Sequence, residues 1–416
     1  MNNVKRITDN VIFSVISKNV LICFTLLLTA YGSLLTVSAQ VAVKGETIWT
    51  MAGENITNGV VLIGANGKIE AVGTAAQVKI PANYKIVSAK VVTPGLIDAH
   101  TVIGLNGYLN QTHDQMALDG SSPIQPELRA IDAYNAEEKL IEWVRGFGVT
   151  TIHTGHSPQA LVSGQTMVAK TFGKTVDDVT LKPLAMVAVT LGESALAGQG
   201  RSPGTRAKQI AMLRAELIKA QENSKKADPP KDLKSDIWVK VIKGEVPLLI
   251  NANKAQDIAS ALRIAKEFNL KIVLDGASEA TLLLGDIKAA GISVIIHPTM
   301  ARAGGDSESL SWETASKLKA AGVTVALQSG YEGYVPKTRV VLFEAAIAAA
   351  NGLSQRDALA TITIDAAKII GMDSRIGSLA VGKDGDIALY DGDPFEYVTH
   401  CIGTIIDGKV VSETVR

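Results

Sequence analysis

The chain has 416 residues, of which 47% are hydrophobic, 20% are charged and 5% are aromatic. This length and this apolar content exclude both a disordered protein and a small domain held together by disulfides. The 41 lysine and arginine residues balance the 41 aspartate and glutamate residues, so we expect no nucleic-acid partner.

The first forty residues have the composition of an export signal. Basic residues precede the apolar run at 20–28 (VLICFTLLL), and small side chains occupy 37–39 (VSA). This order predicts a signal peptide over residues 1–39, cleaved near Ala39, and a periplasmic protein. The alternative is an uncleaved segment that anchors the chain in the membrane, although the residues after 28 are poorly apolar for a span.

Short strands are predicted near both ends of the mature chain. Residues 41–93 contain runs of β-forming residues broken by Asn66-Gly67, which is a hairpin signal. The chain from about Ser374 onward has the same pattern, with Asp407-Gly408 as a second hairpin signal. We therefore expect one small sheet domain built from both ends of the chain.

The middle of the chain alternates strand-like and helix-like segments. The clearest strands are expected at 247–251 (PLLIN), 271–275 (KIVLD), 293–297 (SVIIH) and 323–328 (VTVALQ), each followed by a helical stretch. Repeated βα units predict a parallel sheet, either doubly wound or closed into a (β/α)8 barrel. No glycine-rich phosphate-binding motif follows a strand, so the usual features of a nucleotide site are missing.

Four segments together resemble the amidohydrolase superfamily. Residues 92–100 (VTPGLIDAH) are an apolar strand that starts at Pro-Gly and ends in Asp-x-His, and residues 376–398 read IGSLAVGKDGDIALYDGDPFEYV. Between them, residues 148–156 (GVTTIHTGH) and 358–372 (ALATITIDAAKIIGM) are similar to the second strand and the last helix of that superfamily. The resemblance runs from about residue 43 to 414 and is closest to the exported imidazolonepropionase-like branch.

This resemblance implies an architecture and a chemistry. It implies a TIM-like (β/α)8 barrel over residues 94–373 and a small β-sandwich formed by residues 40–93 and 374–416. Catalytic groups are expected at the carboxyl ends of the barrel strands. In the superfamily, a divalent metal ion activates a water molecule that attacks an amide, a lactam or a related carbonyl, and an aspartate transfers the proton.

The first and eighth strands lack groups that this resemblance leads us to expect. The first strand of the family carries His-x-His, which places two imidazoles on one face of the strand. Here the sequence is His100-Thr101-Val102, so His100 is a remnant metal ligand and Val102 cannot bind a metal. The eighth strand normally ends in the catalytic aspartate, and this chain has Gly330 at that position.

The fifth and sixth strands normally supply one histidine each. The fifth offers Asn251 or Asn253, and the sixth offers Gly276, or Asp275 if the alignment shifts by one residue. Four of the five expected groups are therefore absent, and no catalytic group is intact. Because a divalent ion of this kind needs three or more suitable protein ligands, the sequence predicts weak or absent conventional activity and no resident cofactor.

A rearranged metal site is an alternative. His100, His153, His156 and His297 all fall at predicted strand ends or in the loops that follow them. If they converge over the barrel mouth, they can hold zinc or another divalent metal. The opposing interpretation is that these histidines make hydrogen bonds within the loops and that His100 alone is a remnant.

The loops after the seventh and eighth strands supply candidate pocket residues. Tyr331, Glu332 and Tyr334 follow the eighth strand and either hold a ligand or form a rigid capping loop. Arg302 follows the seventh strand and can pair with a ligand carboxylate or with Asp306. The other candidate pocket residues are Asn251, Asn253 and Asp275.

Two functions remain open at this point. The first is a relative of hydrolases of non-peptide C–N bonds (cyclic amide or acyl-amino-acid type) that is retained for binding a small-molecule ligand, or as a partner of a catalytically intact relative or of a second copy of itself. The second is an active hydrolase with the rearranged metal site. Because a shared fold does not establish chemistry, the sequence leaves open whether the protein is an enzyme.

Overall fold

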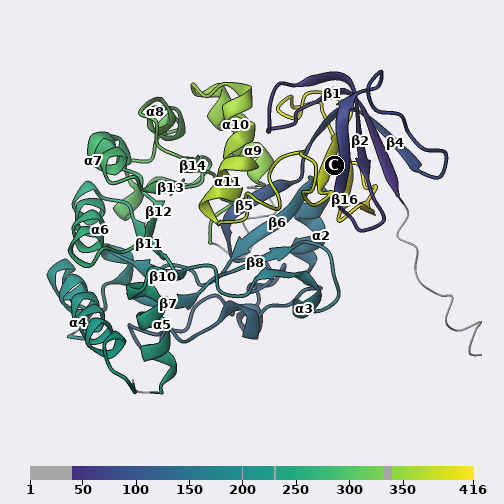
Figure 1. The fold of residues 1–416 in the computed structure, drawn as a ribbon. Coiled ribbons are helices and arrows are strands. Elements are labelled where there is room, and N and C mark those ends of the chain that lie inside the picture. The colour runs from purple at the N-terminus through teal and green to yellow at the C-terminus, as the bar shows by residue number, and fades with distance from the viewer. Residues whose placement is uncertain (1–39, 199, 229–230, 332–339) are drawn as a thin grey trace, which may run out of the picture. The chain divides into compact units, whose positions relative to one another are not determined.

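The computed structural model describes residues 40–416 except 199, 229–230 and 332–339 (Figure 1). The predicted signal segment at 1–39 and the candidate residues Glu332 and Tyr334 lie outside the described residues. Among the residues that are described, no helix has both the length and the apolar character needed to cross a membrane.

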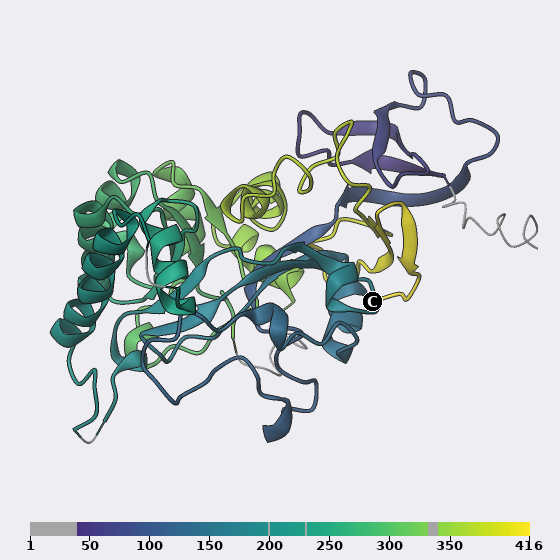
Figure 2. The same cartoon turned by 60° about the horizontal axis from the view of Figure 1, so that its bottom comes forward.

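A seven-stranded sheet joins the two ends of the chain, as the sequence predicts. Its order is β17-β16-β15-β4-β1-β2-β3, and β15 pairs antiparallel with β4, with Leu389 opposite Val92. Figures 1 and 2 both show the purple N-terminal strands beside the yellow C-terminal ones. The strands are β1 (Val41–Ile48), β2 (Ile56–Ile63), β3 (Ile69–Thr74), β4 (Lys85–Pro94), β15 (Ile387–Tyr390), β16 (Cys401–Ile406) and β17 (Lys409–Ser412).

Both predicted hairpin turns are present in this sheet. Asn66-Gly67 connects β2 to β3, and Asp407-Gly408 connects β16 to β17. Asp407 and Gly408 both have positive φ (49° and 74°), which a two-residue type I′ turn requires and which Asp-Gly tolerates. The sequence signal for these turns is therefore a direct consequence of backbone sterics.

The barrel closes between its first and eighth strands. Ala99 N donates to Leu327 O over 3.2 Å, and Thr101 pairs in parallel with Gly330. Successive strands from β10 to β14 pair in parallel, as do β5 and β6. These strands are β5 (Leu96–Thr101), β6 (Val149–Thr154), β10 (Val187–Thr190), β11 (Leu248–Ala252), β12 (Ile272–Gly276), β13 (Ser293–Ile296) and β14 (Val325–Ala326).

The third position of the barrel differs from an all-parallel barrel. The segment formed by β7 (Val162–Gln165) and β8 (Met167–Lys170) runs antiparallel to both neighbours, β6 and β10. Only a short loop, residues 155–161, separates β6 from β7. A parallel return needs a crossover of a dozen or more residues, so this short connection makes the strand reverse. A short strand, β9 (Thr180–Lys182), pairs antiparallel with β8.

Helices follow the later barrel strands, which confirms the four predicted βα units. Helix α6 shows the reason: Ile258, Ala261, Ile264 and Phe268 are buried at helical spacing, and the helix ends where Asn269 adopts a left-handed conformation. The α-helices are α2 (Lys139–Arg145), α3 (Val176–Val179), α4 (Arg206–Ser224), α5 (Leu233–Ile242), α6 (Ala255–Phe268), α7 (Leu284–Ala289), α8 (Thr314–Ala320), α9 (Val341–Ala350), α10 (Gln355–Thr361) and α11 (Ile364–Ile369). The 3-10 helices are η1 (Thr112–Asp114), η2 (Ala130–Asp132), η3 (Glu193–Ala195), η4 (Ala280–Leu283) and η5 (Gly305–Ser307).

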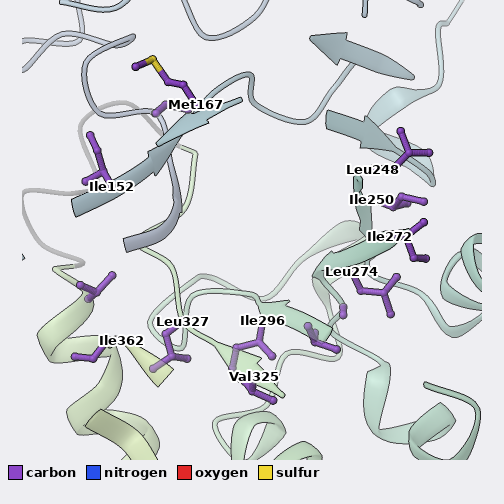
Figure 3. Packing of buried hydrophobic residues seen from close by; sticks show 14 of the residues in the cluster. Ile152, Met167, Leu248, Ile250, Ile272, Leu274, Ile296, Val325, Leu327 and Ile362 are labelled. Carbon is purple, nitrogen blue, oxygen red and sulfur yellow. The ribbon is translucent and has the colours of Figure 1, made fainter. Parts of the chain in front are cut away.

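Alternate residues of several barrel strands, among them β11 and β12, belong to different hydrophobic clusters. Leu248 and Leu274 belong to the larger cluster, in which the strands pack with the surrounding helices (Figure 3). Leu249 and Val273 belong to a second cluster with residues of the other barrel strands. Since strand side chains alternate between faces, residues two positions beyond this second set continue its face toward the carboxyl ends of the strands. This alternation determines which polar residues meet at the barrel mouth.

Candidate functional site

Asp275 is the centre of a buried polar network at the barrel mouth. Its side chain lies at the end of β12 and is 1% exposed. Oδ1 accepts a hydrogen bond from Gln328 Nε2 (2.7 Å), and Oδ2 accepts from Asn251 Nδ2 (3.0 Å) and from Tyr331 OH (3.1 Å). His100 Nδ1 lies 3.3 Å from Oδ2. Groups from the first, fifth and eighth strand ends thus converge on one carboxylate of the sixth strand.

The network decides which residue of the sixth strand faces the site. Asp275 lies two positions beyond Val273 on the same strand face, and it pairs in register with Asn251. Gly276 has φ of +77°, and a Cβ built there would lie 2.7 Å from Asn253 Oδ1. Of the two alternatives left open by the sequence, Asp275 is the one whose side chain makes contacts with the other residues of the network.

The charge state of Asp275 follows from its neighbours. Burial acts to raise the pKa of this carboxyl, because it penalises the charged form. The charge of His100 and the hydrogen bonds from Asn251 and Gln328 outweigh burial and hold the pKa below its ordinary value. Asp275 is therefore an ionised carboxylate whose oxygens accept hydrogen bonds from protein donors.

His100 lies at the end of β5 and is 1% exposed. Its ring centroid lies 5.7 Å from that of His153 and 5.2 Å from that of Tyr331. Neither ring nitrogen makes a hydrogen bond of good geometry with a described residue. The contact between His100 and Asp275 is therefore an electrostatic one, without a directed hydrogen bond. Of the predicted metal histidines, His100 is the one that contacts the network around Asp275.

His153 is committed to the barrel wall. Its Nδ1 lies 2.6 Å from Ala99 O, and its Nε2 lies 2.6 Å from Thr166 Oγ1. Because a carbonyl oxygen only accepts, Nδ1 carries the proton and Nε2 accepts from the threonine hydroxyl. Burial lowers the pKa of His153 to about 3, so the ring is neutral. Both nitrogens that a metal would need are already in use.

The other two predicted histidines lie away from the network. His297 Nδ1 lies 2.9 Å from Pro298 O, and its Nε2 lies 3.3 Å from Thr314 Oγ1 at the start of α8. The His156 ring packs against Gly164, where a Cβ would lie 2.4 Å from its Cδ2. Burial lowers the pKa of each histidine to about 4. The structure does not gather the four histidines around one point.

These residues do not fit the divalent-metal centre that the resemblance implies. Across the described ranges, no three His, Cys, Asp or Glu side chains are placed to hold a metal ion. At the mouth, the lone pairs of the Asp275 carboxylate are directed to N–H and O–H donors of Asn251, Gln328 and Tyr331. Amide nitrogens cannot coordinate a cation as imidazoles do, so the donor set is chemically different from that of a zinc site.

Two residues that the sequence analysis did not select secure the eighth strand. Ser329 donates from its backbone N (3.1 Å) and its Oγ (2.5 Å) to the carboxylate of Asp98 on β5. Burial raises the pKa of Asp98 to about 7, although these hydrogen bonds lower it. These two hydrogen bonds hold Ser329, and with it the neighbouring residues Gln328 and Gly330, against β5. The sequence signal for Gln328 was its position two residues beyond Ala326 on one strand face.

A cavity of about 360 Å³ lies above this network. Asn251 and Tyr331 are part of its lining and connect it to Asp275. Its other lining residues come from the loop after β6, from η3, from the end of β11 and from η5, and are Ser157, Pro158, Gln159, Glu193, Ser194, Asn253, Gly304, Gly305, Asp306 and Ser307. The loops at the carboxyl ends of the strands thus form a pocket where barrel proteins bind their ligands.

The predicted role of Arg302 needs correction. Its side chain is exposed and is not part of the cavity lining. Asp306, which the sequence offered as its partner, pairs instead with Arg206 (2.9 Å). Arg206 also bonds Asp257, so the guanidinium holds η5 against the first turns of α4 and α6.

The candidate residue Asn253 lines the cavity, and its Oδ1 accepts a hydrogen bond from the Ser278 hydroxyl.

Comparisons with known proteins agree with this architecture. A model of the amidohydrolase family matches residues 283–412. Imidazolonepropionase of Fusobacterium nucleatum is 25% identical over 407 residues, which cover 85% of this chain and 91% of that protein. Imidazolonepropionase of Symbiobacterium thermophilum is 35% identical over 91 residues, or 22% of this chain and 21% of the relative.

A solved structure extends the similarity to the whole fold. The crystal structure of an amidohydrolase from Thermotoga maritima superimposes with a TM-score of 0.84 at 26% identity, covering 90% of this chain and all of the other. The fold and these similarities define a barrel protein of the amidohydrolase type. Together the family model, the two imidazolonepropionases and this structure support the amidohydrolase superfamily and, within it, the imidazolonepropionase-like branch.

Proposed function

We propose that this chain binds a small molecule at the barrel mouth and has weak or no conventional metal-dependent hydrolase activity. The observation that carries the proposal is the Asp275 carboxylate, whose two oxygens accept hydrogen bonds from Gln328, Asn251 and Tyr331. A metal ligand must direct its lone pairs at a cation, and these lone pairs are directed at N–H and O–H groups.

The eighth strand supports the same proposal. Metal-dependent hydrolysis needs a group that takes a proton from the attacking water. Gly330 has no side chain to do this, and the neighbouring Gln328 amide is bonded to Asp275 and to the carbonyl of Ile296. The family similarity relates the chain to hydrolases of non-peptide C–N bonds. The residues at the barrel mouth, in contrast, are suited to holding a ligand.

A ligand-binding role is favoured over a purely structural partner role by the cavity. The cavity lies over Asn251 and Tyr331, and most of its described lining residues carry a polar side chain. Small-molecule sites are concave and carry a few convergent polar groups, which is the arrangement found here. Ligand binding is compatible with a protein partner, which would be a second copy of the chain or a catalytically intact relative.

The rearranged metal site has a specific cost. The short distance between the His100 and His153 rings (5.7 Å) and the His100 ring nitrogens, which make no hydrogen bond with a described residue, favour it. For His153 to bind a metal, it would have to give up its hydrogen bonds to Ala99 and Thr166. Each buried group left without a partner costs about 1–3 kcal/mol, so the metal would have to compensate both.

The test measures metal content and turnover in the same preparation. The protein is purified without chelators, its metal is quantified, and hydrolysis of N-acyl dipeptides and lactams is compared with that of His100→Ala. We expect far less than one equivalent of metal and no His100-dependent turnover. His113→Ala, which removes an exposed histidine, is the matched control. Stoichiometric zinc or iron with turnover that depends on His100 would refute the proposal.

A further inference from the structure

We infer that the cavity above Asn251 binds a cationic head group rich in hydrogen-bond donors, either a primary ammonium or a guanidinium, and not a carboxylate. This inference rests on the proposed small-molecule binding and specifies the chemical class of the ligand. It follows from three observations: the orientation of one buried amide, the direction of one hydroxyl proton, and the charge of the cavity wall.

The Asn251 amide presents an acceptor to the cavity. Its Nδ2 donates to Asp275 Oδ2 (3.0 Å) and to Tyr331 OH (2.6 Å), which uses both of its hydrogens. The opposite orientation is excluded because an ionised carboxylate is only an acceptor and would face the amide oxygen. Asn251 is 4% exposed, and no described residue donates to its Oδ1. Asn251 lines the cavity, so this amide oxygen is an acceptor available to a ligand donor.

The Tyr331 hydroxyl is oriented by the same network. Its proton is directed to Asp275 Oδ2 over 3.1 Å, while its oxygen accepts from Asn251. The phenol therefore does not direct its proton into the cavity. The floor of the pocket offers acceptor atoms, which suits a ligand with several N–H groups better than a ligand carboxylate.

The wall of the cavity is acidic. Glu193 is exposed to the cavity and forms no ion pair with a described residue, and a Cβ built on Gly305 would lie 4.0 Å from its Oε2. Asp306, the other charged lining residue, shares Arg206 with Asp257. One guanidinium thus serves two carboxylates, and Glu193 adds a further negative charge. None of the described residues that line the cavity is a lysine, an arginine or a histidine.

Together these features favour a cation and disfavour an anion. Unlike charges a few ångströms apart in a partly enclosed site attract, and a ligand carboxylate would face Glu193 with no cation among the described lining residues to offset it. The cavity of about 360 Å³ holds a head group with a short chain. The Asn251 side-chain carbonyl and the Glu193 carboxylate are the two acceptors that would receive hydrogen bonds from such a head group.

The experiment titrates the full chain with four probes built on an unbranched four-carbon chain: n-butylguanidinium, n-butylammonium, butanamide and butanoate. Binding is measured by calorimetry and by ligand-observed NMR. We expect the two cations to bind and butanoate to show no binding. Asn251→Ala is expected to weaken cation binding about tenfold or more, since it removes a hydrogen bond to a charged group.

Glu193→Gln is a second variant that should not disturb folding, because Glu193 is exposed. A change in its cation affinity therefore reports on binding alone. We expect the substitution to weaken cation binding about three- to fivefold, as for a partly exposed ion pair. Glu222→Gln, which makes the same change of charge at an exposed position of α4 outside the cavity lining, is expected to have no effect.

The outcomes separate this inference from the proposed function. Butanoate or butanamide binding as tightly as the cations would overturn the ligand class while leaving small-molecule binding intact. Equal weakening by Glu193→Gln and Glu222→Gln would mean general attraction to an acidic surface and would overturn the site. Absence of binding by all four probes would also overturn it. The proposed function itself falls only on the metal and turnover measurements described above.

Discussion

The ammonium group of Lys170, on the barrel strand β8, lies 3.0 Å from Oδ2 of Asp384, which precedes β15 of the seven-stranded sheet. Lys170 also bonds Asp386 and, at 3.2 Å, Asp407. Its side chain is 3% exposed, and that of Asp384 is fully buried. Burial acts to lower the pKa of Lys170, but the three carboxylates outweigh it and raise the pKa to about 12. One buried cation therefore joins the barrel to the sheet built from both chain ends.

Replacing this cation with an apolar side chain of similar length is expected to be severely destabilising. Lys170→Met leaves Asp384 and Asp386 buried without their shared cation, and removing one partner of a buried pair costs about 3–5 kcal/mol. The measurement is the free energy of unfolding in urea. Lys208→Met, at an exposed lysine of α4, is the control and should change stability little. A loss below about 1 kcal/mol for Lys170→Met would show that the network is not stabilising.

The same network predicts how stability depends on acid. Burial acts to raise the pKa of Asp384, but the charge of Lys170 and hydrogen bonds from Lys68, Lys170 and Arg375 lower it to about 2. Because the folded pKa lies below the unfolded one, the stabilisation is present above about pH 4 and is lost as the pH falls through 2. It amounts to about 2 kcal/mol.

We therefore expect Asp384→Asn to be less stable than the wild type at neutral pH, with the difference shrinking between pH 4 and pH 2. Urea unfolding across this range measures it. Asp177→Asn, at an exposed aspartate of α3, should run parallel to the wild type at every pH. A difference between Asp384→Asn and the wild type that stays constant down to pH 2 would contradict the assignment.

Most of the fold was predictable from local sequence, because its signals are local. Asn66-Gly67 and Asp407-Gly408 predicted hairpins, since few residues tolerate the positive φ of a type I′ turn. The βα units followed from strand-like runs ahead of amphipathic stretches. The reversed strand β7–β8 was not predicted, because its direction depends on the missing crossover helix after β6 and on pairing across the barrel.

The candidate site was predictable only in part. His100, Asn251 and Asp275 were selected because they end strands, and they do meet. The hydrogen bond from Gln328 to Asp275 and the direction of each hydrogen bond in the network depend on barrel closure, which no short motif encodes. The one-residue ambiguity between Asp275 and Gly276 also required the structure, because both residues end the same apolar run.

The hydrogen bond between His153 and Thr166 is expected to stabilise the fold. Thr166→Val removes the hydroxyl that lies 2.6 Å from His153 Nε2 and 3.1 Å from Met186 N, which leaves both groups buried without this partner. The expected loss is about 1–3 kcal/mol for each unpaired group. Thermal and urea unfolding measure it, and Thr166→Ser should retain most of the stability. If Thr166→Val and Thr166→Ser are equally stable, the hydroxyl contributes nothing and His153 is free to rotate.

The alignment of the sixth strand can be tested by adding one methyl group. Gly276 has φ of +77°, and a Cβ there would lie 2.7 Å from Asn253 Oδ1 and 3.0 Å from Asn251 Nδ2. Gly276→Ala is expected to cost about 1–3 kcal/mol through backbone strain and to disturb the amides that line the cavity. Gly285→Ala is the matched control, because Gly285 lies in α7 with open space around it and should gain a few tenths of a kcal/mol or more from helix propensity. Unfolding free energies of the two variants are compared with the wild type. If Gly276→Ala were as stable as the wild type, a side chain at position 276 would fit without strain, and the argument that assigns Asp275 rather than Gly276 to the site would be contradicted.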